Sequence, residues 1–531
     1  LRQKAKEISP IITEIVSEIN QIPLEKQQKE IQEKYPELLE IKKEKPQKEN
    51  TLPALKNIEG KEIITRFPPE PNGYPHIGHA KAAIISDEYA KIHGGKIILR
   101  FEDTNPGTER LEYYAAIKVG MDWLGIKYDS VEYVSDSLDI LYKKADQIIK
   151  SNDAYVCTCS QDSISKDRRE MTECRCTKQS LEENEKLWHK MFDEKGFKEG
   201  QALLRFRGNM QSGNTTMRDP ALFRINTKRH ARQEQKYKVW PTYDFAGIIF
   251  DSISKVSHAM RSKEFELRKE LHHTILDKLG MEKAEFIFFG RLDLEGMPVS
   301  KSALKPLIEN GKVPWYDDPR LPTLEGLRRR GIRPEAVKKF ILSLGLTKND
   351  TVSPFASLEA FNKKIIDGES VRLHMVRNPK ELKIANLPSS EFHLSNHPTM
   401  DLGKRTVNID NSVMIEGEDA KDLKNEESIR LLGIGIVKIT DSSDLTAEFI
   451  SENAENIEKK IQWVAGEPIK IKIIVPDQLF FGEKFNEDSL KEVEGFVEQA
   501  YLKLKDGDEI QFIRFGYCRK ESTHQVIFTH K

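Results

Sequence analysis

The stretch T-R-F-P-P-E-P-N-G-Y-P-H-I-G-H-A-K, residues 65–81, decides the fold of this chain because it marks a passage from a strand to a helix. Residues 62–67 are rich in apolar and β-prone side chains, and the cluster of Pro, Asn and Gly at 68–75 ends that run. A helical pattern follows from about Ala80. A strand that turns into a helix in this way is a place where α/β proteins hold a nucleotide.

Two histidines and a glycine fall at the predicted start of that helix. Free backbone N–H groups and the helix dipole attract phosphate at such an N-terminus. We expect Gly78 to let a nucleotide approach the backbone closely. We expect the imidazoles of His76 and His79 to donate hydrogen bonds to phosphate oxygens as charge builds up in a transition state. The pattern therefore favours nucleotidyl transfer.

The same stretch resembles the HIGH motif of class I aminoacyl-tRNA synthetases, in the extended form of the glutamyl and glutaminyl enzymes. An isolated H-x-G-H is usually a pair of surface histidines, but the preceding R-F-P-P-E-P-N-G-Y makes this match specific. The resemblance implies a Rossmann-like catalytic domain that uses ATP with Mg²⁺. It places these residues of the stretch at the nucleotide: Pro69, Glu70, Pro71, Asn72, His76, Ile77, Gly78 and His79.

Length and composition agree with a large enzyme of several domains, because 531 residues exceed what one core accommodates. Lys and Arg number 84 against 85 Asp and Glu, a formal charge of −1, so any tRNA-binding surface must be a local patch. No apolar run approaches the ~20 residues that span a bilayer. The N-terminus lacks the order of a secretory signal, so we expect a cytoplasmic location and no membrane contact.

Four of the five cysteines form two close pairs, C-T-C and C-R-C, separated by a polar loop. Zn²⁺ binds four thiolates in a tetrahedron, so Cys157, Cys159, Cys174 and Cys176 are candidate ligands. The usual spacing is C-x-x-C, and reduced, unliganded thiols are the alternative. No H-E-x-x-H motif lies nearby, which favours a structural site. The position resembles the zinc site that related glutamyl enzymes carry in their acceptor-end insertion.

The chain divides into four predicted parts with different patterns. They are an N-terminal helical extension and linker (1–58), a Rossmann-like catalytic domain (59–290) with an acceptor-end insertion at about 138–240, a KMSKS-like loop with a helical stem-contact domain (291–370), and an all-β region (371–531). The extension carries one apolar stripe, which docks either on the chain's own body or on a protein partner: Ile8, Ile11, Ile12, Ile15, Val16 and Ile19.

A second buried strand, Lys96 to Glu102, ends in D-T-N-P at 103–106. Ligands of open α/β sheets lie at the carboxyl ends of strands, so Asp103 is placed to receive a cation such as the α-ammonium of an amino acid. An Asx-turn or a helix N-cap is the alternative for Asp103. The resemblance favours the substrate role, because related synthetases bind the amino group with an acidic residue of this segment.

The segment W-P-T-Y-D-F, 240–245, is predicted to resume the sheet after the insertion. The resemblance makes Tyr243 a substrate-binding tyrosine, whereas an aromatic residue at such a position is otherwise core. Arg261 in S-H-A-M-R-S-K-E-F stands where glutamyl enzymes place an arginine for the γ-carboxylate and glutaminyl enzymes a small uncharged residue. The resemblance adds Arg66 as a further cationic contact and Ser262 as an ATP contact.

A second phosphate-binding element is predicted at 288–302, F-F-G-R-L-D-L-E-G-M-P-V-S-K-S. Its end resembles the KMSKS loop, in which a lysine neutralises charge on the α-phosphate and the leaving pyrophosphate. Pro298 replaces the first Lys of that motif, so Lys301 has the main electrostatic role and is the third catalytic candidate beside the two histidines. The ATP contacts implied here are Arg291, Leu292, Val299, Ser300 and Lys301.

Two later regions are predicted to contact tRNA. The densest basic cluster, Arg328, Arg329, Arg330 and Arg333, is either a solvated face or a contact to backbone phosphates. From about Val371 short alternating strands follow, which resemble the β-barrel anticodon-binding domains of glutaminyl and archaeal or eukaryotic-type glutamyl enzymes.

Taken together, the resemblance implies an archaeal-type glutamyl enzyme that forms glutamyl-adenylate and passes the acyl group to the terminal 2′-hydroxyl of tRNA(Glu). Use of tRNA(Gln) as a second acceptor stays open. A glutaminyl enzyme is the nearest alternative, and Arg261 opposes it. A non-catalytic tRNA-binding relative is opposed by the intact histidines, Asp103 and Lys301, and a truncated paralogue that modifies a tRNA base by the long β region.

Overall fold

The computed structural model describes residues 18–19, 22–34, 52–298, 301–453 and 457–531. The chain forms two compact units, Leu1–Thr51 and Leu52–Lys531. In the first unit, helix α2 spans Leu24–Lys34. The predicted apolar stripe of the extension lies outside the described residues except for Ile19, which is exposed. Among the described residues, no helix has the length and apolar character needed to cross a bilayer.

The second unit begins with a parallel sheet whose strand ends form the candidate site. Strands β1 (Ile64–Phe67), β2 (Lys96–Phe101) and β3 (Ser130–Tyr133) pair in that order, and β8 (His258–Ser262) pairs in parallel with β9 (Glu285–Phe289). The two sheets meet where the backbone N–H of Ser257 donates to the carbonyl of Ile64 at 2.9 Å. The carboxyl ends of these strands therefore share one edge, where α/β proteins bind ligands.

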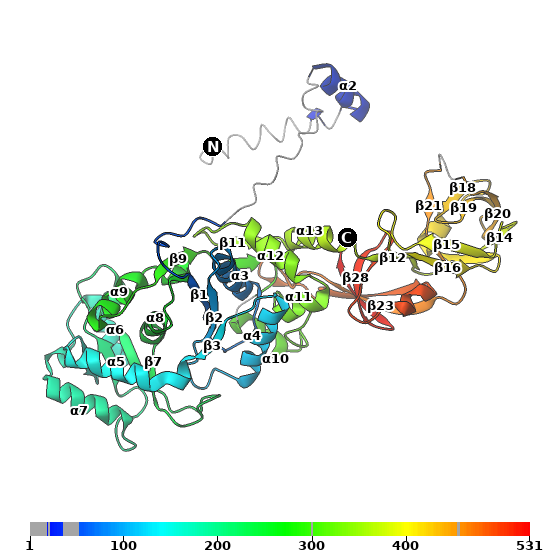
Figure 1. Ribbon diagram of the computed structural model, residues 1–531. Helices are drawn as coiled ribbons and strands as arrows, with labels where there is room; N and C mark the ends of the chain where they lie inside the picture. The colour runs from blue at the N-terminus through cyan, green and yellow to red at the C-terminus, as the bar shows by residue number, and fades with distance from the viewer. Residues whose placement is uncertain (1–17, 20–21, 35–51, 299–300, 454–456) are drawn as a thin grey trace. The chain divides into compact units, whose positions relative to one another are not determined.

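Helix α3 (Ile77–Ile92) follows β1 and packs on the sheet, and α4 (Leu111–Trp123) follows β2 (Figure 1). Ile84 and Ile117 of these helices share a buried core with Leu99 and Phe101 of β2. The helix predicted after the HIGH-like stretch is confirmed, with His76 as its N-cap. This packing fixes the helix N-terminus beside the strand ends.

The insertion is an antiparallel sheet with helices on its surface. Its elements are β4 (Ala154–Cys157), β5 (Leu203–Phe206), β6 (Ala221–Ile225), β7 (Val239–Pro241), α5 (Leu138–Lys150), α6 (Gln161–Glu170) and α7 (Leu181–Phe192). The prediction that W-P-T-Y-D-F resumes the parallel sheet is wrong. Trp240 belongs to β7, where its ring stacks on His230 at 4.9 Å, and Tyr243 begins α8 (Tyr243–Ile253). The parallel sheet resumes only at β8.

A helical segment follows the catalytic sheet. Helix α9 (Arg268–Leu279) connects β8 to β9 and precedes this segment, whose elements are β10 (Leu292–Leu294), α10 (Lys301–Glu309), α11 (Leu324–Arg330), α12 (Pro334–Ser343), β11 (Thr351–Ser353) and α13 (Phe355–Ile366). Strands β10 and β11 pair in parallel. Val337 and Phe340 of α12 join the core that holds α3 and β2, so the helical segment is continuous with the catalytic domain.

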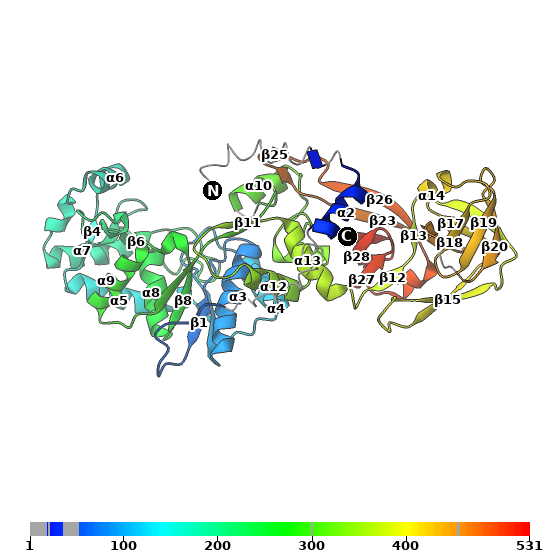
Figure 2. The same cartoon turned by 90° about the horizontal axis from the view of Figure 1, so that it is seen from above.

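The region from 371 onward is all-β except for short helical turns, as predicted, and forms two seven-stranded sheets (Figure 2). The first contains β12 (Val371–Leu373), β13 (Met375–Val376), β23 (Ile469–Pro476), β26 (Leu490–Val497), β27 (Glu509–Phe512), β28 (Gly516–Ser522) and β29 (Gln525–His530). The second contains β14 (Lys380–Ala385), β17 (Ser412–Ile415), β18 (Ser428–Leu431), β19 (Gly435–Asp441), β20 (Thr446–Ser451), β21 (Lys460–Ile461) and β22 (Trp463–Val464).

Smaller elements complete this region: the hairpins β15 (Glu391–Ser395) with β16 (Lys404–Asn408) and β24 (Phe480–Phe481) with β25 (Lys484–Phe485), and helix α14 (Gly417–Lys421). Each seven-stranded sheet has its own hydrophobic core. The first sheet takes strands from both ends of the region, so the second sheet is inserted within the sequence of the first.

The arginine run at the end of α11 does not form an open basic face. Arg329 pairs with Glu521 at 2.5 Å, Arg330 with Glu359 at 3.0 Å, Arg333 with Glu509 at 2.6 Å and Arg328 with Glu325 at 2.6 Å. Because Glu509 and Glu521 lie in β27 and β28, two of these pairs tie the helical segment to the first β sheet. The structure therefore places the predicted phosphate-contact cluster in an interface between domains.

Candidate active site

The two histidines of the HIGH-like stretch cap helix α3 and fix each other's orientation. His76 Nδ1 accepts the backbone N–H of Gly78 at 3.1 Å, and His79 Nδ1 accepts the backbone N–H of His76 at 3.3 Å. Burial lowers the pKa of His79 to about 4 and that of His76 well below its ordinary value. Both rings are therefore neutral with Nδ1 as acceptor, so each presents Nε2–H as its donor.

This capping corrects part of the prediction for the helix N-terminus. The backbone N–H of Ile77 donates to the carbonyl of Pro322 at 2.9 Å, and that of Gly78 is used by His76. A side chain on Gly78 would place its Cβ 2.9 Å from His76 Cε1. Gly78 thus makes room for the His76 imidazole rather than for a nucleotide. The donors available to phosphate are therefore the Nε2–H groups of His76 and His79, in place of the backbone N–H groups of Ile77 and Gly78.

The loop after β1 is held against the segment after β2. The carbonyl of Pro69 accepts the N–H of Glu102 at 3.1 Å, and Glu70 accepts a hydrogen bond from the side chain of Asn105 at 3.2 Å. The carbonyl of Pro71 accepts the N–H of Arg110 at 3.3 Å. The predicted nucleotide loop and the predicted amino-acid segment therefore lie side by side.

A cluster of buried arginines converges on one carboxylate. Asp251 accepts from Arg66 Nε at 2.9 Å and Arg100 Nη1 at 2.7 Å on one oxygen, and from Arg261 Nη2 at 2.7 Å on the other. Although burial raises the pKa of Asp251, the three guanidinium groups hold it far below its ordinary value. Arg100 also pairs with Glu132 at 2.8 Å. Three guanidinium groups pair with two carboxylates, so one guanidinium charge is in excess among these pairs, and Glu102, which makes none of these hydrogen bonds, is a further acid near the three arginines.

Arg66 and Arg261 differ in what they leave for a ligand. Arg66 is 1% exposed, and its Nη1 donates to the carbonyl of Met260 at 2.9 Å. Arg66 thus supports Asp251, and the direct substrate contact expected of Arg66 stays a prediction. Arg261 is 4% exposed, and its Nε–H has no partner in the part of the chain that the structure describes. A buried, unsatisfied donor costs about 1–3 kcal/mol, which a ligand oxygen would recover.

Asp103 does not have the free carboxylate that its predicted role requires. It is fully buried, and it accepts from the N–H of Ser135 at 2.9 Å, the hydroxyl of Ser135 at 2.7 Å and the hydroxyl of Tyr114 at 2.9 Å. These donors fill both oxygens. The geometry makes Asp103 a structural anchor for the segment after β2.

The neighbouring Glu102, which the sequence interpretation missed, has the free carboxylate that binding of a substrate ammonium group requires. Its carboxylate has no hydrogen-bond partner among the described residues, and a Cβ on Gly247 would lie 3.0 Å from Glu102 Oε1. Burial raises the pKa of Glu102 to about 7, although nearby Arg66 acts in the opposite direction. The signal was present in the sequence, because strand alternation puts Glu102 on the same side as Arg100.

Tyr243, which the resemblance predicts to bind substrate, lies beside Arg261. Its ring centroid is 5.6 Å from the guanidinium carbon of Arg261 and 4.8 Å from the ring of Phe265. The side chain of Arg261 also stacks on Phe286 at 4.1 Å. These aromatic faces hold Arg261 in a low-dielectric setting, where a charge contact with a ligand is strong.

The second phosphate element is described only in part. Leu292 is buried, and its carbonyl oxygen lies 3.9 Å from a Cβ built on Gly78, which places β10 beside the HIGH-like stretch. Arg291 is exposed and pairs with Glu264. The Ser262 hydroxyl, at the end of β8, has no partner in the described segments. Lys301 begins α10, and its side chain lies outside the described residues, as do Val299 and Ser300.

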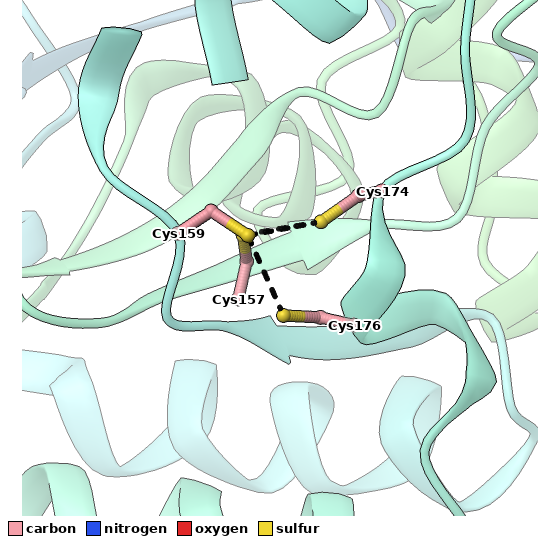
Figure 3. A group of neighbouring side chains, drawn as sticks. All are labelled: Cys157, Cys159, Cys174 and Cys176. Carbon is pink, nitrogen blue, oxygen red and sulfur yellow. Dashed lines mark hydrogen bonds between the residues drawn. The ribbon is translucent and has the colours of Figure 1, made fainter. Parts of the chain in front are cut away.

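The four paired cysteines form one cluster, as predicted (Figure 3). All are free thiols, and their sulfurs lie within 4.8 Å of one another. Sγ–Sγ distances are 3.6 Å for Cys157–Cys174, 3.6 Å for Cys159–Cys174 and 3.8 Å for Cys159–Cys176. A tetrahedron with Zn–S bonds of about 2.3 Å has edges of about 3.8 Å, so the donor set fits structural Zn²⁺.

Residues 62–368 match the model of the tRNA synthetases class I (E and Q) catalytic domain. Residues 370–455 and 460–521 match two anti-codon binding domain models of the same group. The chain belongs to the class I glutamyl and glutaminyl tRNA synthetases. The predicted fold class is thereby confirmed, with an α/β catalytic domain followed by β anticodon-binding domains. This synthetase is an aminoacyl-tRNA ligase, for which the family uses ATP with Mg²⁺.

Curated relatives of this synthetase come from archaea. A glutamate–tRNA ligase of Nitrosopumilus maritimus (strain SCM1) is 56% identical over 533 residues, covering 100% of this chain and 93% of the relative. One of Cenarchaeum symbiosum (strain A) is 50% identical over 532 residues with the same coverage. A crystal structure of a glutamate-tRNA synthetase from Elizabethkingia anophelis matches 58% of this chain and 72% of that chain at 21% identity and a TM-score of 0.43.

Proposed function

We propose that this chain is a glutamate–tRNA ligase that attaches L-glutamate to tRNA(Glu) at the expense of ATP. The observation that carries the proposal is the excess positive charge of the arginine cluster, together with the unpartnered Nε–H of Arg261. The archaeal relatives, which are named glutamate–tRNA ligases, support it. Glutamate differs from glutamine by a carboxylate in place of an amide, and the cluster is complementary to the carboxylate.

In this proposal the amino acid lies between two groups of opposite charge. Glu102 holds the α-ammonium, in place of Asp103, and Arg261 donates to the γ-carboxylate. Tyr243 shapes the pocket between them. Glutamine would leave the excess positive charge uncompensated, which costs several kcal/mol in a buried site.

Adenylate formation then needs charge stabilisation and no protein nucleophile. An oxygen of the α-carboxylate of glutamate attacks the α-phosphorus of ATP, and the bond to the leaving pyrophosphate breaks. The tRNA 2′-hydroxyl later attacks the adenylate and displaces AMP. We propose that Nε2–H of His76 and Nε2–H of His79 donate to phosphate oxygens as the charge on these oxygens increases, and that Lys301 supplies a further positive charge. Bound Mg²⁺ supplies further neutralisation at the phosphates.

The finer assignments are proposals as well. We assign the part boundaries 1–58, 59–290, 291–370 and 371–531, with the insertion at about 138–240, and a structural zinc ion on the cysteine cluster. The remaining predicted ATP contacts, Ser262, Arg291 and Leu292 among them, keep that role. We also retain tRNA(Gln) as a second acceptor, a protein partner for the N-terminal extension and a cytoplasmic location.

The proposal is tested by aminoacylation with labelled glutamate or glutamine on purified tRNA(Glu) or tRNA(Gln). Glutamate on tRNA(Glu) is the expected result, and glutamate on both tRNAs would identify an enzyme that uses both acceptors. Charging with glutamine would establish the glutaminyl alternative and refute the role of Arg261. No charging at all, with tRNA still bound, would identify a non-catalytic relative.

A further inference from the structure

A buried chain of hydrogen bonds lies behind Arg261. His272 Nδ1 is 3.0 Å from Arg261 Nη1, and His272 Nε2 is 3.0 Å from Asp244 Oδ1. The imidazole is fully buried, on helix α9, while Asp244 lies in the first turn of α8. Arg268 pairs with the outer oxygen of Asp244. The chain thus runs from the edge of the protein to the guanidinium that is proposed to read the substrate side chain.

The chemistry of the three groups fixes the position of each proton. A guanidinium has donors only, so His272 Nδ1 must accept from Arg261, and the imidazole proton is therefore on Nε2 and is donated to Asp244. Burial, together with the nearby Arg261 and against the opposing effect of Asp244, lowers the pKa of His272 to about 4. The ring is therefore neutral at physiological pH.

Because His272 is a neutral acceptor, it orients Arg261 without changing the charge of the arginine cluster. Arg261 is oriented from two sides, by Asp251 on Nη2 and by His272 on Nη1, which leaves Nε–H free. A carboxylate in place of His272 would make the same hydrogen bond, but it would cancel the excess positive charge of the cluster. An apolar residue would preserve the charge but leave Nη1 without this partner. Only a neutral acceptor orients Arg261 and keeps its charge available.

We propose that His272, with its tautomer fixed by Asp244, is a positioning residue that sets the specificity of this enzyme for an acidic side chain by holding Arg261 without neutralising it. This inference rests on the proposed function. It assigns the selectivity to a relay of three side chains, Asp244, His272 and Arg261, rather than to Arg261 alone.

The test compares three variants of His272 in the full-length enzyme. His272→Phe keeps a ring but removes the acceptor, and we expect the KM for glutamate to rise about tenfold or more, with the KM for ATP little changed. His272→Gln retains a neutral carbonyl acceptor and should stay within about threefold of the native enzyme. His272→Asp should lose preference for glutamate over glutamine by about a hundredfold, because its charge cancels the excess.

The matched control is His273→Phe, the same substitution at the next residue of α9. The His273 ring also packs against Phe286, with ring centroids 5.2 Å apart, whereas the hydrogen bond to Arg261 comes from His272. We expect its kinetic constants to be unchanged. Equal effects of His272→Phe and His272→Gln, or an unchanged preference for glutamate in His272→Asp, would overturn the inference.

The outcomes also separate this inference from the proposed function. If the native enzyme does not charge tRNA with glutamate, the proposed function fails. If it does, and the His272 variants keep both the native KM and the native preference, only the positioning role fails. If His272→Phe does not fold, the comparison of His272→Gln with His272→Asp still tests the positioning role. Both side chains fill part of the site and can accept a hydrogen bond, but only Asp adds a negative charge.

Discussion

Two arginine clusters in this chain have opposite designs. In the pocket, Arg66, Arg100 and Arg261 share Asp251, and Arg261 Nε–H has no partner among the residues that the structure describes. At the end of α11, each of Arg328, Arg329, Arg330 and Arg333 has a carboxylate partner. The ratio of guanidinium to carboxylate groups separates them: an excess creates a site for an anionic ligand, whereas matched pairs join two domains.

Removing the excess charge should have the largest effect. Arg261→Gln leaves Arg66 and Arg100 matched by Asp251 and Glu132, with no guanidinium in excess of these pairs, so we expect kcat/KM for glutamate to fall by about 10³, equal to about 4 kcal/mol. Aminoacylation of tRNA(Glu) over a range of glutamate concentrations measures this. Arg329→Gln is the matched control, because it removes the same group from a paired cluster. A loss of activity in Arg329→Gln as large as that in Arg261→Gln would remove the distinction between the clusters.

Removing the negative charge of Glu102 should have the next largest effect on activity. The titration of Glu102 should also make the activity depend on pH. Glu102 has a pKa of about 7 in the substrate-free protein, so it is ionised above pH 7 and protonated below. It binds an ammonium group only when ionised, so kcat/KM for glutamate should fall about tenfold per pH unit below about pH 7. His79, with a pKa of about 4, does not titrate in that range.

The Glu102→Gln variant gives the control for that pH profile. It should lose about 10² in kcat/KM at pH 8 through the missing charge and should no longer show the decline near pH 7. A decline that persists in Glu102→Gln would assign it to another group, such as the buried Asp103, whose pKa burial raises to about 6.

The cysteine cluster, for which we propose a structural zinc ion, provides a contrast to the arginine clusters. Cys174→Ser removes one ligand, so we expect loss of bound zinc and a lower melting temperature of the insertion. The KM for tRNA should rise about tenfold as the insertion loosens, while that for glutamate stays the same. Metal content by mass spectrometry measures the first effect. Native protein that is purified with zinc available and contains none would refute the metal site.

Substitution of a paired arginine should have the smallest effect, and the effect should be on stability. Arg333 is 40% exposed and pairs with Glu509 and Glu369, so Arg333→Gln should cost about 1 kcal/mol of stability or less, and less at high salt. Thermal unfolding at two salt concentrations measures this. If the variant instead raises the KM for tRNA while leaving the melting temperature unchanged, the cluster contacts phosphate, as the sequence first indicated.

The comparison also shows which features of a sequence are predictive. The HIGH-like stretch and the cysteine pairs were located correctly because their spacing is local, and a strand, a turn and a helix place those residues directly. Arg329 and Arg333 of the arginine run form ion pairs because Glu521 and Glu509 lie beside them in the fold. These glutamates are more than 170 residues away along the chain. No local pattern reports such partners.

The same limit applies to the choice between Asp103 and Glu102. Asp103 and Glu102 are adjacent acids at the end of one strand, and their sequence context is almost identical. Ser135 and Tyr114 enclose Asp103, whereas the absence of a side chain at Gly247 leaves space for Glu102. The choice between them is made by residues from three other elements. The capping of α3 by its own histidines was likewise hidden, because it depends on rotamers rather than on spacing.

The central claim is that an excess guanidinium donor reads the side-chain carboxylate of glutamate. A crystal structure of the enzyme with L-glutamate and a non-hydrolysable ATP analogue tests it most directly. The account predicts the γ-carboxylate within hydrogen-bond distance of Arg261 Nε, the α-ammonium on Glu102 and His272 still bonded to Arg261. A γ-carboxylate bound elsewhere, with Arg261 Nε still unpartnered, would contradict it.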